Sequence, residues 1–202
     1  MNRTKDERIK LFSDLFDGYH DCVADEYLRN QNLMAYLNSG GFFTAPASTK
    51  YHGAYEGGLF DHSMEVARSL EEFTERMGLK WDREESPFII GMFHDLCKCD
   101  QYIKVMDAGN ITELSNGSVI ETPEEFHYEY NTNTLLKGHG AKSVMILSQF
   151  ITLTEEEMLC IRYHMGAYEK DEWPEFDLAI KKYENVLWTH TADMYASKVM
   201  NT

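Results

Sequence analysis

The sequence has no surplus of positive charge, since 19 lysines and arginines stand against 34 aspartates and glutamates, for a formal net charge of −15. Non-specific binding of a polynucleotide depends on cationic side chains that displace counterions from the phosphates. This composition therefore disfavours long DNA or RNA as a partner. A small anionic substrate remains compatible with it, provided that a few cations or a metal ion reverse the charge locally.

Long apolar runs and paired cysteine motifs are also missing. No segment approaches the roughly 18 consecutive apolar residues of a membrane helix, and the first ten residues lack the apolar centre of a signal peptide. We therefore expect a cytoplasmic protein without a membrane partner. The four cysteines, Cys22, Cys97, Cys99 and Cys160, form no C-x-x-C pair, so we expect reduced thiols that serve mostly in packing.

Helical patterns dominate what the chain does contain. Apolar residues make up 43% of its 202 residues, which is enough for one domain with a sizeable core. Amphipathic spacing and capping signals predict helices within residues 6–16, 61–78, 86–98, 154–164 and 183–200. The sequence therefore predicts an all-α fold, a helical bundle formed by the whole chain, 1–202, as a single domain.

One stretch departs from the helical pattern. The runs "YIKVM" (102–106) and "SVIET" (118–122) are typical of short strands, and Asn116-Gly117 between them is a strong tight-turn signal. A third run, "FHYEY" (126–130), is a candidate additional strand. We therefore expect a small β-hairpin inserted into the bundle at about residues 102–130.

Histidines and aspartates recur where helices are predicted. They are His62 in a first turn, the adjacent pair His94-Asp95, His139 before a further helix, His164 at a helix end, and Asp193 in the last helix. Helix bundles build metal sites from side chains on facing helices. Imidazole and carboxylate suit Mn, Fe, Co, Ni or Zn, and the lack of a C-x-x-C pair argues against a closed structural zinc site.

The series and its surrounding motifs resemble the HD-domain metal-dependent phosphohydrolase superfamily. The motifs are "YHGAYEGGLFDHSMEVA" (51–67), "FHDLCK" (93–98), "RYHMG" (162–166) and "WTHTADMYASK" (188–198). Their sequences are most similar to those of the HD domain of 3′→5′ exoribonucleases. The resemblance covers about residues 51–198, which it implies are the core of a single HD domain. It leaves the first fifty residues uncovered and matches the hairpin insertion only loosely.

The resemblance implies a role for each matched residue. His62, His94, Asp95 and Asp193 would hold one divalent transition metal ion, and Asp95 would bridge to a second ion held by His139 and His164. Lys98 would lie near the substrate phosphate. A single ion, with His139 and His164 acting as helix caps, remains the alternative.

Three further positions have roles that the residues themselves suggest. His52, in a glycine-rich approach to His62, is a candidate to meet a phosphate, and Tyr55 is the aromatic residue that we select to bind substrate. Tyr51, Tyr163 and Tyr168 also lie near the predicted ligands in sequence. His190, one turn before Asp193, is a candidate to orient that ligand. For His52 and His190 a plain structural role stays open. His20 and His127 are expected on the surface.

These observations predict hydrolysis of a phosphoester or phosphoanhydride, through attack of metal-bound hydroxide on phosphorus. Asp95, Lys98 and His52 are the predicted catalytic residues, and a nucleotide or related small phosphoester is the predicted substrate. Alternatives are a 3′→5′ exonuclease or phosphodiesterase acting on short oligonucleotides, an HD-type di-iron oxygenase, and a non-catalytic nucleotide-binding module. We expect no nucleic-acid-binding domain before the predicted domain, so an RNA substrate does not follow from the resemblance. A homo-oligomer stays open.

Overall fold

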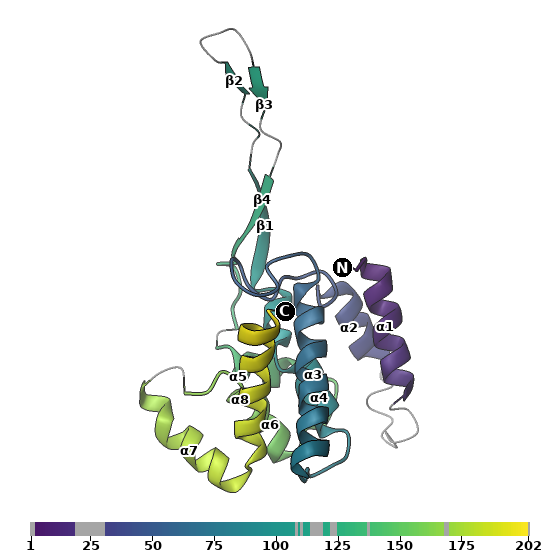
Figure 1. Ribbon diagram of the computed structural model, residues 1–202, viewed down its shortest axis with the longest axis vertical. Helices are drawn as coiled ribbons and strands as arrows, with labels where there is room; N and C mark the ends of the chain where they lie inside the picture. Colours follow the sequence, from purple (N-terminus) through teal and green to yellow (C-terminus); the bar gives the residue numbers. More distant parts are fainter. Residues whose placement is uncertain are drawn as a thin grey trace.

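The computed structural model describes residues 3–18, 31–107, 109, 111–113, 119–121, 125–136, 138–167 and 170–201. In these parts helices form one body, from which a narrow β-ribbon extends (Figure 1). The α-helices are α1 (Lys5–Gly18), α2 (Gln31–Ser39), α3 (Gly58–Met77), α4 (Ser86–Phe93), α5 (Gly140–Leu147), α6 (Glu155–Arg162), α7 (Trp173–Lys182) and α8 (Asn185–Tyr195). This architecture confirms the predicted, mostly helical fold with an inserted hairpin. No helix of the described parts has both the length and the apolar character that crossing a membrane requires.

The N-terminal helices complete the apolar core. Phe12 of α1 is fully buried, and its ring contacts Phe42, Phe43, Phe88 and Phe93 at centroid distances of 5.8–6.5 Å. Truncation of such a buried aromatic residue typically costs about 3–5 kcal/mol of stability. The described residues before position 51, which the family resemblance does not cover, therefore contribute side chains to the same core as α3 and α4.

Buried polar contacts fix the start of α6. Thr154 and Glu157 form the predicted capping box, in which each side chain binds the other's backbone N–H. The Glu157 carboxylate is fully buried and accepts hydrogen bonds from Arg83 Nε and Nη2, both at 2.7 Å, and from Ser86 Oγ at 2.9 Å. Because a buried carboxylate is costly without such partners, these contacts hold α6 against the start of α4.

The ribbon pairs its strands differently from the prediction. β1 (Tyr102–Asp107) pairs antiparallel with β4 (Glu125–Tyr130), and β2 (Ile111–Glu113) pairs with β3 (Val119–Glu121). In both pairs the partners lie equally far from position 116 along the chain. "SVIET" is therefore too close to the turn to pair with "YIKVM", and "FHYEY" pairs with "YIKVM" instead. The Asn116-Gly117 turn itself lies outside the described residues, as do His20, Cys22 and Tyr168.

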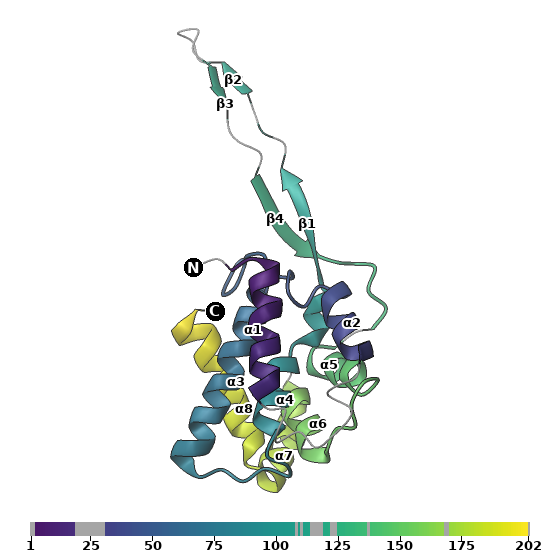
Figure 2. The ribbon, with the colours of Figure 1, turned by 90° about the vertical axis from the view of Figure 1, so that its right-hand side faces the viewer.

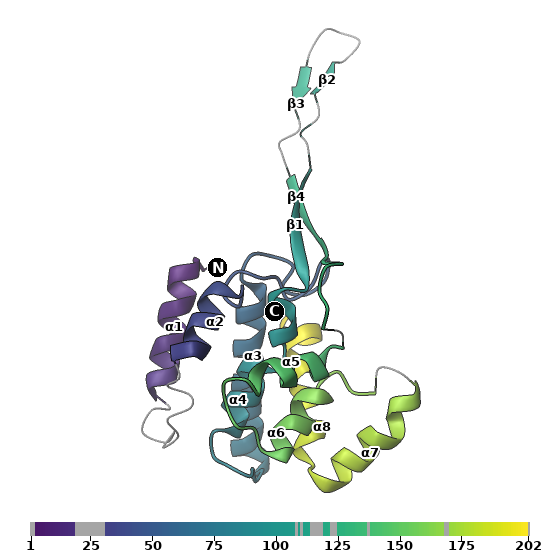
Figure 3. The same cartoon turned by 180° about the vertical axis from the view of Figure 1, so that it is seen from behind.

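The root of the ribbon stands beside the helical body (Figure 2). There Tyr102 of β1 faces Tyr130 of β4, with ring centroids 5.3 Å apart. His127 lies farther out, exposed, between the carboxylates of Asp107 and Glu129, which confirms its predicted surface position. Seen from behind, α5 and α6 lie on the same side of the body as α8 (Figure 3).

Candidate metal centre

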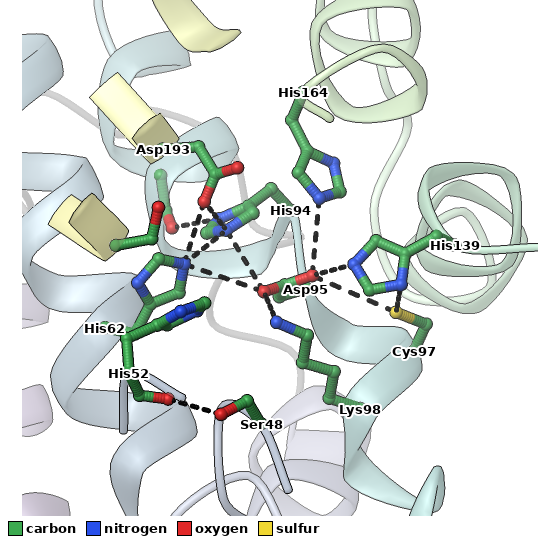
Figure 4. A network of polar contacts seen from close by, with 12 residues as sticks. Ser48, His52, His62, His94, Asp95, Cys97, Lys98, His139, His164 and Asp193 are labelled. Carbon is green, nitrogen blue, oxygen red and sulfur yellow. Dashed lines mark hydrogen bonds and ion pairs between the residues drawn. The ribbon is translucent and has the colours of Figure 1, made fainter. Parts of the chain in front are cut away.

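All six predicted ligands meet around the carboxylate of Asp95 (Figure 4). Its Oδ2 lies 3.4 Å from His94 Nε2 and 3.7 Å from His62 Nε2, and His62 Nε2 is 3.0 Å from Asp193 Oδ1. Its Oδ1 lies 2.8 Å from His139 Nε2 and 3.4 Å from His164 Nε2. We call His62, His94 and Asp193 the inner half of the cluster and His139 and His164 the outer half. Asp95 thus presents one oxygen to each half.

Four of these residues lie at helix ends, whereas the sequence predicted a helix that continued from Ser86 through Lys98. His94 is the C-cap of α4, and Asp95 follows with φ −108° and ψ 21°, before the short 3-10 helix η1 (Leu96–Cys99). The break in the helix lets two neighbouring side chains approach one centre, which residues 100° apart on a regular helix do with difficulty. His139 is likewise the N-cap of α5, and His164 lies just beyond α6.

Two glycines permit the close helix packing that assembles the halves. A Cβ at Gly91 of α4 would lie 2.3 Å from the Ala67 Cα of α3, so only glycine lets these helices bring His94 to His62. A Cβ at Gly140 would lie 2.3 Å from the Arg162 carbonyl oxygen, so the start of α5 rests directly on the end of α6. That second contact brings His139 to His164.

The histidine rings are oriented as metal ligands are. His94 Nδ1 lies 2.8 Å from the Gly91 carbonyl oxygen, and His164 Nδ1 lies 2.7 Å from the Ile161 carbonyl oxygen. A carbonyl accepts only from N–H, so each ring carries a proton on Nδ1 and turns Nε2 toward the cluster. His164 Nε2 is buried without a hydrogen-bond partner and faces an oxygen of Asp95 that is also an acceptor. Two acceptors facing each other require a cation or a proton between them, so the residues fit a metal ion.

Neighbouring charges shift the pKa values of several residues in the cluster. Burial acts to raise the pKa of Asp95, but Lys98, His94 and His139 hold that pKa well below its ordinary value. Burial likewise opposes ionisation of Asp193, while its bond with His62 keeps its pKa low. The pKa of His139 is raised to about 9 because, although burial acts against the charge, the Asp95 carboxylate outweighs it. The cluster therefore keeps anionic carboxylates and attracts cations.

A cavity of about 630 Å³ opens above the cluster, with His139, Asp193, His52 and Lys98 in its lining. Lys98 Nζ lies 2.6 Å from Asp95 Oδ2; burial acts to lower the lysine's pKa, but the carboxylate holds it above the usual value. Arg162 and Lys198 add two cations to the same lining. Glu172 and Asp193 line the cavity as well, and Arg162 lies 3.8 Å from the Glu172 carboxylate, so the lining carries charges of both signs.

Of the other predicted site residues, His52 lies closest to the cluster. Its ring is 5.0 Å from that of His62, and its pKa is lowered to about 4, first by burial and then by His62. Its Nδ1 is buried without a partner. Tyr55 instead donates to Asp61 Oδ2 at 3.1 Å, a carboxylate that also pairs with the buried Arg8. The Tyr55 hydroxyl is therefore already hydrogen-bonded to Asp61.

His190 was predicted to orient Asp193, and it contacts His164. Its Nδ1 lies 2.8 Å from the backbone carbonyl oxygen of His164, so it is His164, in the outer half, that this ring steadies. Tyr51 lines the cavity as an exposed side chain, and Tyr163 packs in the core against Phe176.

Several residues in or beside the site were not singled out from the sequence; Arg162 and Lys198 are two of them. Cys97 Sγ lies 3.6 Å from His139 Nδ1 and 4.0 Å from Asp95 Oδ1, where the sequence predicted a packing residue. Tyr102 and Tyr130 line the cavity at the ribbon root. The strand pairing predicted from the sequence did not oppose these tyrosines. The pairing of Tyr102 with Tyr130 can be predicted from the sequence, because both lie equally far from position 116 in the Asn116-Gly117 turn.

Comparisons of the chain with protein-family models, with curated proteins and with solved structures found no match. The described residues nonetheless contain three groups able to hold an ion: His62, His94 and Asp193; His94, Asp95 and His164; and Asp95, Cys97 and His139. Buried His, Asp and Cys side chains of this kind suit a divalent transition metal.

Proposed function

We propose that this protein is a metal-dependent phosphohydrolase of the HD type that acts on a nucleotide or a related small phosphoester. The observation that carries the proposal is the convergence of four histidines on the two oxygens of the buried Asp95 carboxylate, with Asp193 beside them, next to a cavity whose lining includes Lys98, Arg162 and Lys198. His62, His94, Asp95 and Asp193 would hold one ion, and Asp95, His139 and His164 a second. Bound divalent ions of this kind lower the pKa of a water ligand and polarise a phosphoryl oxygen.

The residues of the chain supply the remaining requirements of phosphoryl chemistry. Lys98 is cationic and lies at the floor of the cavity beside Asp95, where it can neutralise charge that builds on phosphoryl oxygens. His52, whose pKa near 4 keeps it neutral at physiological pH, can form a hydrogen bond with the same group. Arg162 and Lys198 can receive a further anionic part of the substrate.

The size and walls of the cavity favour a small substrate. A volume of about 630 Å³ falls within the range of small-molecule sites, which is roughly 300–1,000 Å³. Tyr51, Tyr102 and Tyr130 offer aromatic faces on which a base can stack. A long polynucleotide needs a continuous cationic track, and a chain of net charge −15 is a poor source of one.

A substrate screen tests the proposal. Purified protein is loaded separately with Mn, Co, Ni and Fe and supplied with nucleoside mono- and triphosphates, cyclic nucleotides and short oligonucleotides, and release of phosphate or nucleoside is measured. We expect turnover of at least one small nucleotide, abolished by Asp95→Ala. Efficient cleavage of oligonucleotides without turnover of any mononucleotide would identify an exonuclease. Mixed-valent iron with oxygen uptake on adding substrate would identify an oxygenase, and protein that takes up no metal would favour a binding module.

A further inference from the structure

The Nδ1 contacts of the cluster histidines include one of an unusual kind. His94 and His164 each direct Nδ1 to a backbone carbonyl of their own helix, at 2.8 Å and 2.7 Å. His139 directs Nδ1 to a side chain, the Sγ of Cys97, at 3.6 Å (Figure 4). The orientation of this ring therefore depends on an atom that a point mutation can remove.

The sulfur is held in a fixed position relative to His139. Cys97 is fully buried in η1, and its backbone N–H donates to Ser143 Oγ at 3.0 Å. Ser143 is also fully buried and belongs to α5, the helix whose N-cap is His139. One hydrogen bond thus ties the backbone of the cysteine to the helix that carries the histidine.

We propose that Cys97 is a positioning residue for the outer half of the cluster. Its Sγ accepts a hydrogen bond from His139 Nδ1–H, and the ring then presents Nε2 to Asp95 Oδ1, 2.8 Å away. The inference rests on the proposed function, because the orientation matters only if the cluster binds metal. Outer partners of this kind orient a ligand and set its basicity, and their loss typically lowers metal affinity about 10–100-fold.

The geometry favours this role over direct coordination by sulfur. Cys97 Sγ faces Nδ1, whereas Nε2 is the atom that approaches Asp95. His164, whose unpartnered Nε2 points to the same Asp95 oxygen, marks the side on which an ion would lie. Cys97 Sγ also lies 4.0 Å from Asp95 Oδ1, but His139 Nε2 is closer to that oxygen, at 2.8 Å.

Metal titrations of cysteine variants test the inference. Wild type, Cys97→Ala, Cys97→Ser and His139→Ala are titrated with Co²⁺ against a chromophoric chelator, with elemental analysis for stoichiometry and thermal melting for fold. Cys160→Ala, which removes a fully buried thiol of α6 outside the three candidate groups, is the matched control. We expect Cys97→Ala to weaken the second ion about 10–100-fold and to leave the first unchanged. Cys97→Ser, which keeps an acceptor, should recover part of the loss.

Other results distinguish failure of the positioning role from failure of the proposed function. Unchanged affinity for both ions in Cys97→Ala would overturn the positioning role and leave the proposed function standing. An intense near-ultraviolet thiolate-to-cobalt band that Cys97→Ser abolishes would also overturn it, because the sulfur would then be a ligand. A wild-type protein that binds no Co²⁺ would refute the proposed function itself, before any variant is compared.

Discussion

The two halves of the cluster share Asp95 but are built differently. The inner half comes from α3, the end of α4, and α8, around a helix contact so close that Gly91 admits no Cβ, and its histidines are fully buried. The outer half comes from the ends of α5 and α6, where Gly140 likewise admits no Cβ, and His164 is fully buried, but the His139 side chain is 29% exposed. The two halves therefore differ chiefly in the exposure of His139 and in its contact with the Cys97 sulfur.

Removing the shared ligand should erase the difference between the halves. Asp95→Ala takes away both bridging oxygens, so we expect it to abolish binding of a divalent transition metal at either half. His94→Ala removes a ligand of the inner half and should abolish binding there. Elemental analysis after dialysis measures the outcome, with Asp107→Ala on the exposed ribbon as a control. Full metal occupancy in Asp95→Ala would refute the assignment of the cluster.

Lys98 should separate binding from catalysis. In Lys98→Ala we expect the metal content of wild type but a rate lower by about 10²–10³, since the lysine acts on substrate charge and not on the ion. Initial rates at saturating metal, together with elemental analysis of the same sample, check this. Lys104→Ala, on the ribbon and partly exposed, is the matched control and should keep its rate. A Lys98→Ala protein with the wild-type rate would remove this residue from the proposed catalytic group.

His164 should distinguish one half from the other. His164→Ala removes a ligand of the outer half alone, so a protein that binds two ions should retain about one. The retained ion should be the tighter one, because the inner ligands are undisturbed. Elemental analysis measures how many ions the variant retains. Loss of both ions would show that the halves form a single site and would contradict the distinction drawn above.

Gly140 offers a gentler way to disturb the outer half. In Gly140→Ala the added Cβ meets the Arg162 carbonyl, and backbone on both sides must move apart. We expect weaker binding of the second ion, by less than in His164→Ala, and a lower melting temperature, because such overpacking costs about 1–3 kcal/mol. Calorimetric titration measures the affinity. Unchanged second-ion affinity would show that α5 and α6 can separate without moving His139.

The sequence reveals the ligand types better than their arrangement. Spacing and motif resemblance identify His62, His94, Asp95, His139, His164 and Asp193, and the structure brings these six together. The bend at Asp95 and the contact of His190 with a carbonyl depend on tertiary packing, which helical periodicity does not encode. Cys97 was assigned to packing because its own neighbours in sequence give no reason to place it beside His139, 42 positions away.

Lower pH should weaken binding of an ion to the outer half. The pKa of His139 near 9 lies above the usual histidine value of about 6.5, so at pH 7.5 the metal-free ring carries a proton that an ion must displace. Binding of the second ion should therefore release close to one proton at pH 7.5, and its affinity should rise with pH until about 9 and then level off. Calorimetry in two buffers of different ionisation enthalpy counts the protons. His139→Ala should release fewer, and equal release in both proteins would show that His139 binds no ion.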